Sequence, residues 1–245
     1  MVEKIALFVE GKSELIFVKS LLLKISNCSK IKISCWGVLA DNNLNTESFS
    51  YCSPPVKIEI LLVKVGGDEK VASVIKSRAQ GLFSQGFTTI WGLRDMYSKE
   101  YDKQSKGQIN NSISNKVITN ITKSFAETGL NGRVHIFFSV MELEAWFLSF
   151  HEALSKMGLP IEEINKVIKK DITKIDPETE FFHPKLTLAL ICSSILKKSY
   201  KEAKFAHGLS TKIHLDEIKS LAKSGKVFHF RKFYGSLEKK LRVCN

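Results

Sequence analysis

Short apolar runs alternate with amphipathic segments along the first 150 residues of the chain. Each run is rich in Ile, Val, Leu or Phe, which is typical of a buried β-strand. Between the runs, apolar side chains recur every three or four residues, the spacing of one helix face. Alternating strands and helices predict an α/β fold with a mainly parallel sheet and right-handed crossovers. The predicted strands are residues 4–9, 32–39, 57–65, 87–93 and 133–139, and the predicted helices are 13–25, 69–84, 109–128 and 142–151.

The pattern changes after residue 151, where only helical spacing remains. We therefore expect two parts: an α/β core over residues 1–150, and a mostly helical C-terminal region over residues 151–245, packed on or beside the core. Segments 40–55 and 96–107 are rich in polar residues and are predicted to be loops. The helices predicted after residue 151 are 161–170, 185–198, 211–223 and 228–243.

Composition favours a cytoplasmic protein. No apolar stretch reaches the roughly 18 residues that a membrane-spanning helix needs, and the N-terminus lacks the pattern of a signal peptide. The five cysteines of the 245-residue chain are scattered without a C-x-x-C pair. They indicate reduced thiols, since a disulfide framework or a zinc site would show regular spacing.

Charge points to an anionic partner. The formal net charge is +12, and it is unevenly spread: residues 1–150 hold 18 basic and 14 acidic residues, against 19 and 11 in residues 151–245. A basic surplus attracts polyanions such as nucleic acid. A solvated lysine-rich surface would give the same numbers, so charge alone leaves both interpretations open.

Carboxylates follow three of the predicted strands. Glu10 ends the first strand, Asp95 follows the fourth, and Glu142 and Glu144 follow the fifth. Ligands of open parallel sheets bind at the carboxyl ends of strands, and Mg²⁺ prefers carboxylate oxygens. Each residue alone could instead cap a helix or form an ordinary ion pair. Glu142 and Glu144 would lie roughly 200° apart on one helix, so both can face one site only if the helix begins between them.

Three segments carry a resemblance to a known family. FVEGKSELIF resembles the first motif of Toprim domains, the catalytic core of topoisomerases, bacterial primases and OLD-type nucleases. TTIWGLRDMYS resembles the second motif, although Tyr97 replaces the second aspartate of the usual D-x-D. Uncharacterised bacterial Toprim-like proteins, including the RloB-like family, share this D-x-Y form and a later motif similar to LEAWFLSFH at 143–151. Their C-terminal lysine motif is loosely similar to HPKLTLALI. The resemblance implies a Toprim-like Rossmannoid core.

The resemblance also implies roles for individual residues. Glu10, Asp95 and Glu144 would be catalytic and would bind Mg²⁺ or Mn²⁺, with Glu14 as an auxiliary ligand. Lys12 and Ser13 open the first helix, where backbone N–H groups can hold a phosphate. For Lys12, a plain surface lysine is the competing interpretation.

Arg231 and Lys232 are candidate contacts to nucleic acid. They lie in the segment VFHFRKFY at 227–234, which interleaves aromatic and basic residues. Aromatic side chains can stack on bases while cations hold phosphates. Helical spacing favours the alternative that Phe230, Phe233 and Leu237 belong to the core.

These observations lead to a main hypothesis of a Mg²⁺-dependent nuclease that cleaves DNA or RNA, in host defence against phage or in a mobile element. The alternative is a non-catalytic nucleotide- or nucleic-acid-binding subunit that partners an ATPase, which the missing second aspartate of D-x-D favours. The chain has no Walker motif, so any ATPase would be a separate protein. A scaffold that has lost the chemistry is a third interpretation. No membrane association is expected, and a homo-oligomer is compatible with the sequence.

Overall fold

A seven-stranded, mainly parallel sheet organises the first part of the computed structural model, which describes residues 2–39, 43–67, 70–130 and 132–244. The strand order is β3-β2-β5-β1-β6-β7, with β4 also paired to β2. Pairs β1–β5, β1–β6 and β2–β5 are parallel, whereas the short β3 and β4 run antiparallel to β2. The strands are β1 (Glu3–Val9), β2 (Ile31–Val38), β3 (Leu44–Thr46), β4 (Tyr51–Cys52), β5 (Ile58–Lys64), β6 (Thr89–Asp95) and β7 (Val134–Ser139).

Strand β1 shows why the apolar runs are continuous. It lies between β5 and β6, and its residues from Ile5 to Val9 are at most 1% exposed. A parallel strand with both faces covered needs apolar side chains at every position and not only at alternate ones. The five strands predicted from the apolar runs are confirmed, with small differences at their ends.

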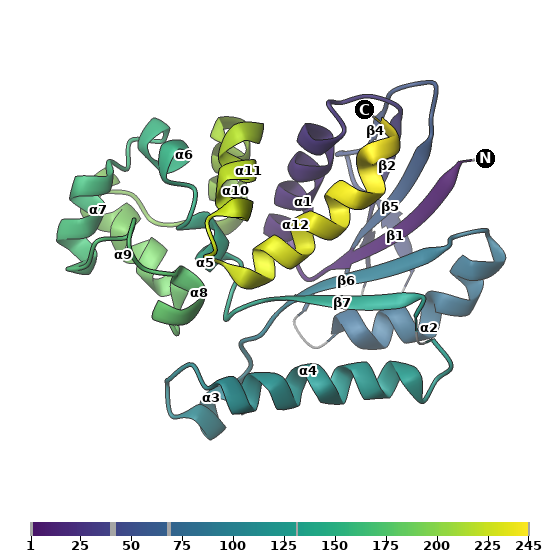
Figure 1. Cartoon of the computed structure of the whole chain (residues 1–245), viewed down its shortest axis with the longest axis horizontal. Helices are drawn as coiled ribbons and strands as arrows, with labels where there is room; N and C mark the ends of the chain where they lie inside the picture. The colour runs from purple at the N-terminus through teal and green to yellow at the C-terminus, as the bar shows by residue number, and fades with distance from the viewer. Residues whose placement is uncertain (1, 40–42, 68–69, 131, 245) are drawn as a thin grey trace. The chain divides into compact units, whose positions relative to one another are not determined.

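Helices cover both faces of the sheet. Helix α1 (Lys12–Ile25) and helix α2 (Lys70–Ser84) lie on opposite faces (Figure 1). One apolar cluster joins Phe8 of β1, Val71 and Ile75 of α2, and Phe125 of helix α4 (Asn111–Ala126). The start of helix 69–84 predicted at Glu69 lies outside the described residues.

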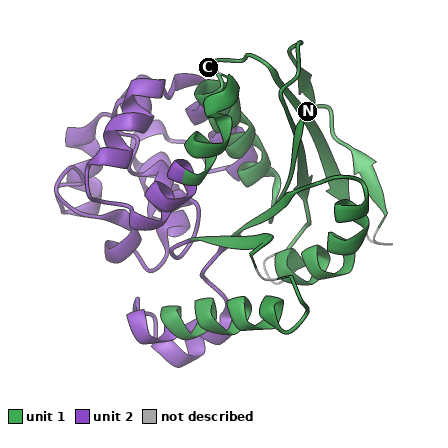
Figure 2. Cartoon of the chain, turned by 45° about the vertical axis from the view of Figure 1, so that its right-hand side comes forward, with its two compact units in different colours: residues 1–94, 114–138, 236–245 green, residues 95–113, 139–235 purple. Residues whose placement is uncertain are grey.

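The chain divides into two compact units (Figure 2). Unit 1 comprises Met1–Arg94, Ser114–Phe138 and Ser236–Asn245, and unit 2 comprises Asp95–Ile113 and Ser139–Gly235. The division predicted at residue 150 therefore differs from the one that the contacts define. The C-terminal residues belong to unit 1, where Lys240 forms an ion pair with Glu3 and the Cys244 thiol lies 3.9 Å from the Lys30 carbonyl oxygen.

Unit 2 is helical and packs around aromatic side chains. Trp146 and Phe233 stack with ring centroids 5.8 Å apart, and Phe230 meets Trp146 edge-on at 5.3 Å. All three side chains are fully buried, which confirms the core interpretation of Phe230 and Phe233. Its helices are α3 (Lys99–Ser105), α5 (Glu144–Phe147), α6 (His151–Lys156), α7 (Ile161–Ile168), α8 (Pro177–Glu180), α9 (Pro184–Leu196), α10 (Glu202–Lys212), α11 (Leu215–Lys223) and most of α12 (Phe228–Leu241), after which unit 1 contains the short η1 (Arg242–Cys244).

Segment 96–107 is not the predicted loop, because helix α3 forms there. Ser98 caps it by accepting a hydrogen bond from the Tyr101 N–H at 3.1 Å, and acidic residues occupy its first turn. The Tyr101 ring is 2% exposed and its hydroxyl donates to the Asn110 carbonyl at 3.0 Å. One buried aromatic side chain thus anchors a helix whose other residues are almost all polar, so periodicity could not reveal it.

Two further predictions needed adjustment. Segment 40–55, predicted to be a loop, contains the short strands β3 and β4; residues 40–42 lie outside the described ones. The helix predicted at 211–223 is divided, because α10 ends at Lys212 and α11 begins at Leu215. None of the helices within the described ranges is long and apolar enough to cross a membrane.

Gly92 permits the close approach of α2 to the sheet. A Cβ atom at this position would lie 2.6 Å from Ile136 Cδ1 and 2.8 Å from Val71 Cγ1, closer than side chains pack. Gly92→Ala should therefore lower the free energy of unfolding by about 1–3 kcal/mol through overpacking. Urea denaturation tests this, with Gly235→Ala as the control, because a Cβ there meets nothing within 4 Å. Equal stability of the two variants would contradict the packing argument.

Candidate functional site

Glu10 stands at the carboxyl end of β1 in unit 1, as the sequence predicts. Its side chain is only 5% exposed, and its carbonyl oxygen accepts a hydrogen bond from the Gly66 N–H at 2.8 Å. The last register pair between β1 and β6 is Val9 with Leu93, so Glu10 and Arg94 are the next residues on neighbouring strands. Arg94 is 8% exposed. Burial of a carboxylate and a guanidinium group at adjacent strand ends requires compensating interactions.

The first turn of α1 gives Glu14 a structural role. Its Oε2 accepts a hydrogen bond from the Gly11 N–H at 2.9 Å, which satisfies one of the open donors at the helix start. Ser13 beside it is 5% exposed, whereas Lys12 is exposed and its Nζ lies 5.5 Å from the centroid of the Phe49 ring. Of the residues predicted here, Lys12 therefore has the freest access to solvent.

Asp95 begins a second group of polar residues, which lies in unit 2. Its Oδ1 accepts a hydrogen bond of 2.5 Å from the hydroxyl of Ser139, the last residue of β7. The pairing continues beyond the strands, because the Met96 N–H donates to the Ser139 carbonyl and the Tyr97 N–H to the Met141 carbonyl, both at 2.8 Å. This extended pairing leads the chain directly from Asp95 and Ser139 to the two glutamates that follow.

Helix α5 begins between the paired glutamates. Leu143 is its N-cap and Glu144 its first residue, so Glu142 precedes the helix and helical spacing does not separate the two carboxylates. Glu142 Oε2 accepts a hydrogen bond from the Lys185 N–H at 3.0 Å. Glu144 Oε1 accepts one from the Tyr200 hydroxyl at 2.7 Å. Because the helix begins between Glu142 and Glu144, both carboxylates can face one site.

Glu144 has the electrostatics of an acid–base group. It is 5% exposed, and burial raises its pKa to about 7, against the lowering effect of the Tyr200 hydrogen bond; the charge of Glu142 raises it further. A carboxyl group that titrates near neutral pH can both take up and release a proton under physiological conditions. Perturbed pKa values of this kind concentrate at functional sites.

Lys185, Tyr200 and Glu202 complete this group. The Lys185 ammonium forms an ion pair with Glu202. Burial acts to lower its pKa, but the hydrogen bond and charge of Glu202, together with Glu144 and Glu142, raise it overall. Burial and the Glu144 carboxylate also raise the pKa of Tyr200. Sequence reasoning noted Lys185 only as part of HPKLTLALI and missed the other two, because nothing local marks a tyrosine 56 positions from its partner.

Tyr97, the third residue of the D-M-Y motif, packs with aromatic rings. Its ring centroid lies 5.9 Å from that of Phe182 and 5.3 Å from that of His183. Burial, followed by the charges of Asp102 and Glu142, raises its pKa. This position supplies a neutral hydroxyl where the usual motif supplies a second carboxylate.

Glu178 resembles Glu144 in pKa but differs in its hydrogen bonds. Burial raises its pKa to about 7 as well. Its Oε1 accepts from the Trp146 indole N–H at 2.7 Å and the Phe230 N–H at 3.1 Å, and its Oε2 from the His229 N–H at 3.0 Å. Both oxygens are therefore occupied in holding the start of α12 against Trp146. Glu178 is a structural carboxylate.

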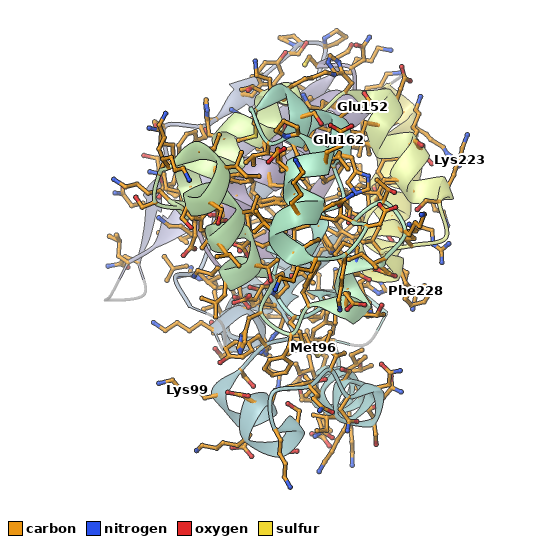
Figure 3. The ribbon with its side chains drawn as sticks, turned by 90° about the vertical axis from the view of Figure 1, so that its left-hand side faces the viewer. Met96, Lys99, Glu152, Glu162, Lys223 and Phe228 are labelled. Atoms are coloured by element: carbon orange, nitrogen blue, oxygen red, sulfur yellow. The ribbon has the colours of Figure 1, made fainter. Side chains whose placement is uncertain are left out.

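Arg231 and Lys232 flank an exposed aromatic side chain in unit 2. Phe228, labelled in Figure 3, is 45% exposed. Lys232 Nζ lies 4.4 Å and the Arg231 guanidinium carbon 5.6 Å from its ring centroid. An exposed ring between two cations is a suitable surface for stacking a nucleic-acid base beside held phosphates.

The predicted metal can be judged from the side chains that could serve as its ligands. Among the residues that the structure describes, no group of three or more His, Cys, Asp or Glu side chains has a metal-binding arrangement. Mg²⁺ commonly takes one or two protein carboxylates and completes its shell with waters and substrate phosphates. Asp95 together with Glu142 or Glu144 offers ligands of that chemical kind, and Mg²⁺ or Mn²⁺ binding stays a prediction.

Comparisons with known proteins add little to this picture. No model of a known protein family matches the chain, and no curated protein matches it either. Among solved structures, the chain is similar to the "putative cell surface hydrolase from Lactobacillus plantarum WCFS1", with 9% sequence identity and a TM-score of 0.33 over 86% of this chain and 98% of that one. The fold itself defines a mixed α/β protein with a mostly parallel sheet flanked by helices and a helical C-terminal region.

Glu144→Gln and Glu178→Gln should differ in stability at pH 8. The pKa of Glu144 is raised from 4.5 to about 7 in the folded protein. The folded state then binds a proton more tightly than the unfolded one, so stability falls as pH rises from about 4.5 to about 7. Gln is neutral throughout and can still accept from Tyr200. Glu144→Gln should therefore match the wild type near pH 4.5 and gain roughly 1–3 kcal/mol at pH 8.

Glu178→Gln removes a charge with the same raised pKa, but it also turns an amide NH₂ towards donors that both carboxylate oxygens accept. At pH 8 it should therefore be about 1–3 kcal/mol less stable than Glu144→Gln. Urea denaturation at pH 4.5 and pH 8 measures both variants. A loss of stability in Glu144→Gln at pH 8 would show that this carboxylate is structural like Glu178.

Proposed function

We propose that this protein is a divalent-metal-dependent nuclease that cleaves phosphodiester bonds in DNA or RNA, with Glu144 as its general base. The observation that carries the proposal is the buried Glu144 carboxyl group, whose pKa of about 7 arises from burial beside Glu142. Hydrolysis of a phosphodiester needs a base that is deprotonated near neutral pH yet accepts a proton readily. A buried glutamate of this kind suits that task better than an exposed one.

The residues of unit 2 divide the work in this proposal. Tyr200 holds Glu144 Oε1, and the Glu144 carboxylate takes a proton from the attacking water. Lys185, kept protonated by Glu202, supplies positive charge for the phosphate or the leaving oxygen. Asp95, fixed by Ser139, is a metal ligand. Mg²⁺ or Mn²⁺ bound there would lower the pKa of a coordinated water and offset charge on the phosphate.

The residues predicted in unit 1 have their own roles in the proposal. Glu10, at the carboxyl end of β1, is a proposed metal ligand, in line with the resemblance of FVEGKSELIF to the first Toprim motif. Glu14 supports it indirectly through the α1 cap, and Lys12 and Ser13 offer the helix start to a phosphate. The same resemblance suggests a cytoplasmic role in phage defence or in a mobile element. The five cysteines, all free thiols in the structure, are consistent with a reducing compartment.

Cleavage assays on single- and double-stranded DNA and RNA test the proposal directly. We expect cleavage with Mg²⁺ or Mn²⁺ and none with EDTA. Glu10→Gln, Asp95→Asn and Glu144→Gln should each reduce the rate at least 100-fold, in line with the loss of a metal ligand or a general base. The wild-type rate should rise with pH and level off above about pH 7, as Glu144 loses its proton.

Glu152→Gln is the matched control, because its exposed side chain lies in the same unit and makes only an i,i+4 ion pair with Lys156. It should cleave at the wild-type rate. Metal-dependent cleavage that persists in Glu144→Gln and Asp95→Asn would place the chemistry elsewhere. Absence of cleavage on all four substrates would contradict the nuclease proposal for the isolated chain.

The second candidate is a nucleic-acid-binding subunit that works with a separate ATPase. The surface formed by Phe228, Arg231 and Lys232 favours it, because stacking and phosphate binding require no catalytic carboxylate. Replacement of the usual second aspartate by Tyr97, which packs with aromatic rings, favours it too. This surface would serve a nuclease equally well in holding its substrate.

Phe228→Ala and the double variant Arg231→Ala/Lys232→Ala should both weaken binding of a single-stranded oligonucleotide in EDTA. Loss of one stacked base is worth about 1–3 kcal/mol, a reduction of roughly 5- to 150-fold in affinity. The double variant should also reduce the slope of log affinity against log salt by about 1–2, because two phosphate contacts are lost. Fluorescence anisotropy at several salt concentrations measures both. Lys223→Ala/Lys219→Ala on α11 is the charge-matched control, and equal effects from it would show that binding depends on net charge alone.

A further inference from the structure

Unit 1 contains a pocket of about 620 Å³ on the face of the sheet that α2 covers only in part. Its floor comes from β1, β2 and β5, and its wall from α2. The burial pattern of β2 reveals the opening: alternate residues are buried on one face, whereas Lys32, Ser34 and Trp36 on the other are only half-buried. A volume of this size lies within the range of sites that hold one small organic molecule.

The floor of the pocket has a charged end. Register places Glu59 of β5 between Lys32 of β2 and Lys4 of β1. Lys32 Nζ lies 2.7 Å and Lys4 Nζ 4.0 Å from the oxygens of that carboxylate. Arg78 of α2 also lines the pocket. Lys32 and Lys4 therefore flank one carboxylate, and two cations beside one anion leave a positive charge at this end for a bound group to balance.

The opposite end of the floor is apolar. Four residues further along the strands, register aligns Trp36 of β2, Val63 of β5 and Phe8 of β1. At about 3.3 Å per residue, this apolar row lies about 13 Å from the charged one. Trp36 is half-buried, whereas Trp91 and Trp146 are 4% and 0% exposed. A tryptophan that stays accessible at the end of a pocket can stack against a flat ligand.

Gly81 keeps the wall of the pocket open. It lies inside α2, where glycine is less favourable than alanine by about 1 kcal/mol. Its φ is not positive, and an added Cβ would meet no atom within 4 Å, so neither backbone conformation nor packing requires glycine. Gly92 differs, because there a Cβ would clash with three side chains. A glycine at position 81 is useful if a ligand occupies the open space beside it.

From these observations we propose that this pocket binds a small organic anion: a flat apolar body seated against Trp36, with a carboxylate, sulfonate or phosphate group near Lys32 and Lys4. The two ends of the pocket differ in polarity, so they fix the direction in which such a molecule enters. The lining residues all belong to unit 1, and they do not include Glu10, Asp95 or Glu144, so the pocket shares no residue with the carboxylates proposed for catalysis.

A matched pair of fluorescent probes tests both ends of the pocket. 8-Anilinonaphthalene-1-sulfonate carries the required anion, whereas N-phenyl-1-naphthylamine has the same ring system without it. We expect the sulfonate to bind the wild type with a single saturable site and at least ten-fold more tightly than the neutral probe. Excitation of tryptophan should transfer energy to the bound sulfonate, and Trp36→Phe should remove most of that transfer.

Gly81→Leu adds a side chain on the pocket wall, where a Cβ meets nothing within 4 Å, and should abolish binding of both probes while leaving the melting temperature unchanged or higher. Gln80→Leu, at the neighbouring exposed position outside the pocket, is its control and should bind as the wild type does. Lys32→Met should weaken only the sulfonate, about ten-fold, and Lys123→Met on α4 should not. Undiminished binding to Gly81→Leu, equal affinity for the two probes, or no saturable binding to the wild type would each overturn the proposal.

Discussion

Burial of β1 on both faces is the constraint on which the rest of unit 1 depends. Its neighbours β5 and β6 pair with it in parallel, and its residues from Ile5 to Val9 are withdrawn from water. No charged side chain can be placed within such a strand without a large desolvation penalty. Charged groups are therefore confined to its two ends, with Lys4 at one and Glu10 at the other. The pocket extends along β1 from Lys4 to Phe8, and the predicted metal ligand Glu10 follows the last residue of the strand.

Unit 2 shows how the same penalty produces two different carboxylates. Glu144 and Glu178 are both buried and both have a pKa of about 7. Glu178 receives three donors from Trp146 and the start of α12, and these use both of its oxygens. Glu144 accepts from the Tyr200 hydroxyl and from its own backbone N–H, and it lies near a second carboxylate and a lysine. Burial alone does not mark a functional acid; the charged groups gathered around Glu144 are what distinguish it from Glu178.

Sequence patterns predicted the strands of the sheet because buried parallel strands leave unbroken apolar runs. They also predicted that Glu10 and Asp95 stand at the ends of strands, and the structure confirms that they stand there. Helix α3 escaped prediction because only Tyr101 and Ser105 of its residues are buried. Tyr200 and Glu202 escaped because their partners lie far away in the chain, and such pairings are fixed by tertiary packing. The return of Ser236–Asn245 to unit 1 has the same origin, since an ion pair between Lys240 and Glu3 has no local signature.

At two positions, Gly81 and Glu144, a different residue would make the folded protein more stable. At Gly81 a larger residue would strengthen α2 without a clash, and at Glu144 a neutral amide would avoid the burial of charge. Natural proteins accept such local losses mainly where a site needs space or a titrating group. Glu178, whose two oxygens are both used in packing, is not of this kind. The same physical criterion therefore selects the pocket of unit 1 and the carboxylate of unit 2, although the two sites share no residue and serve different chemistry.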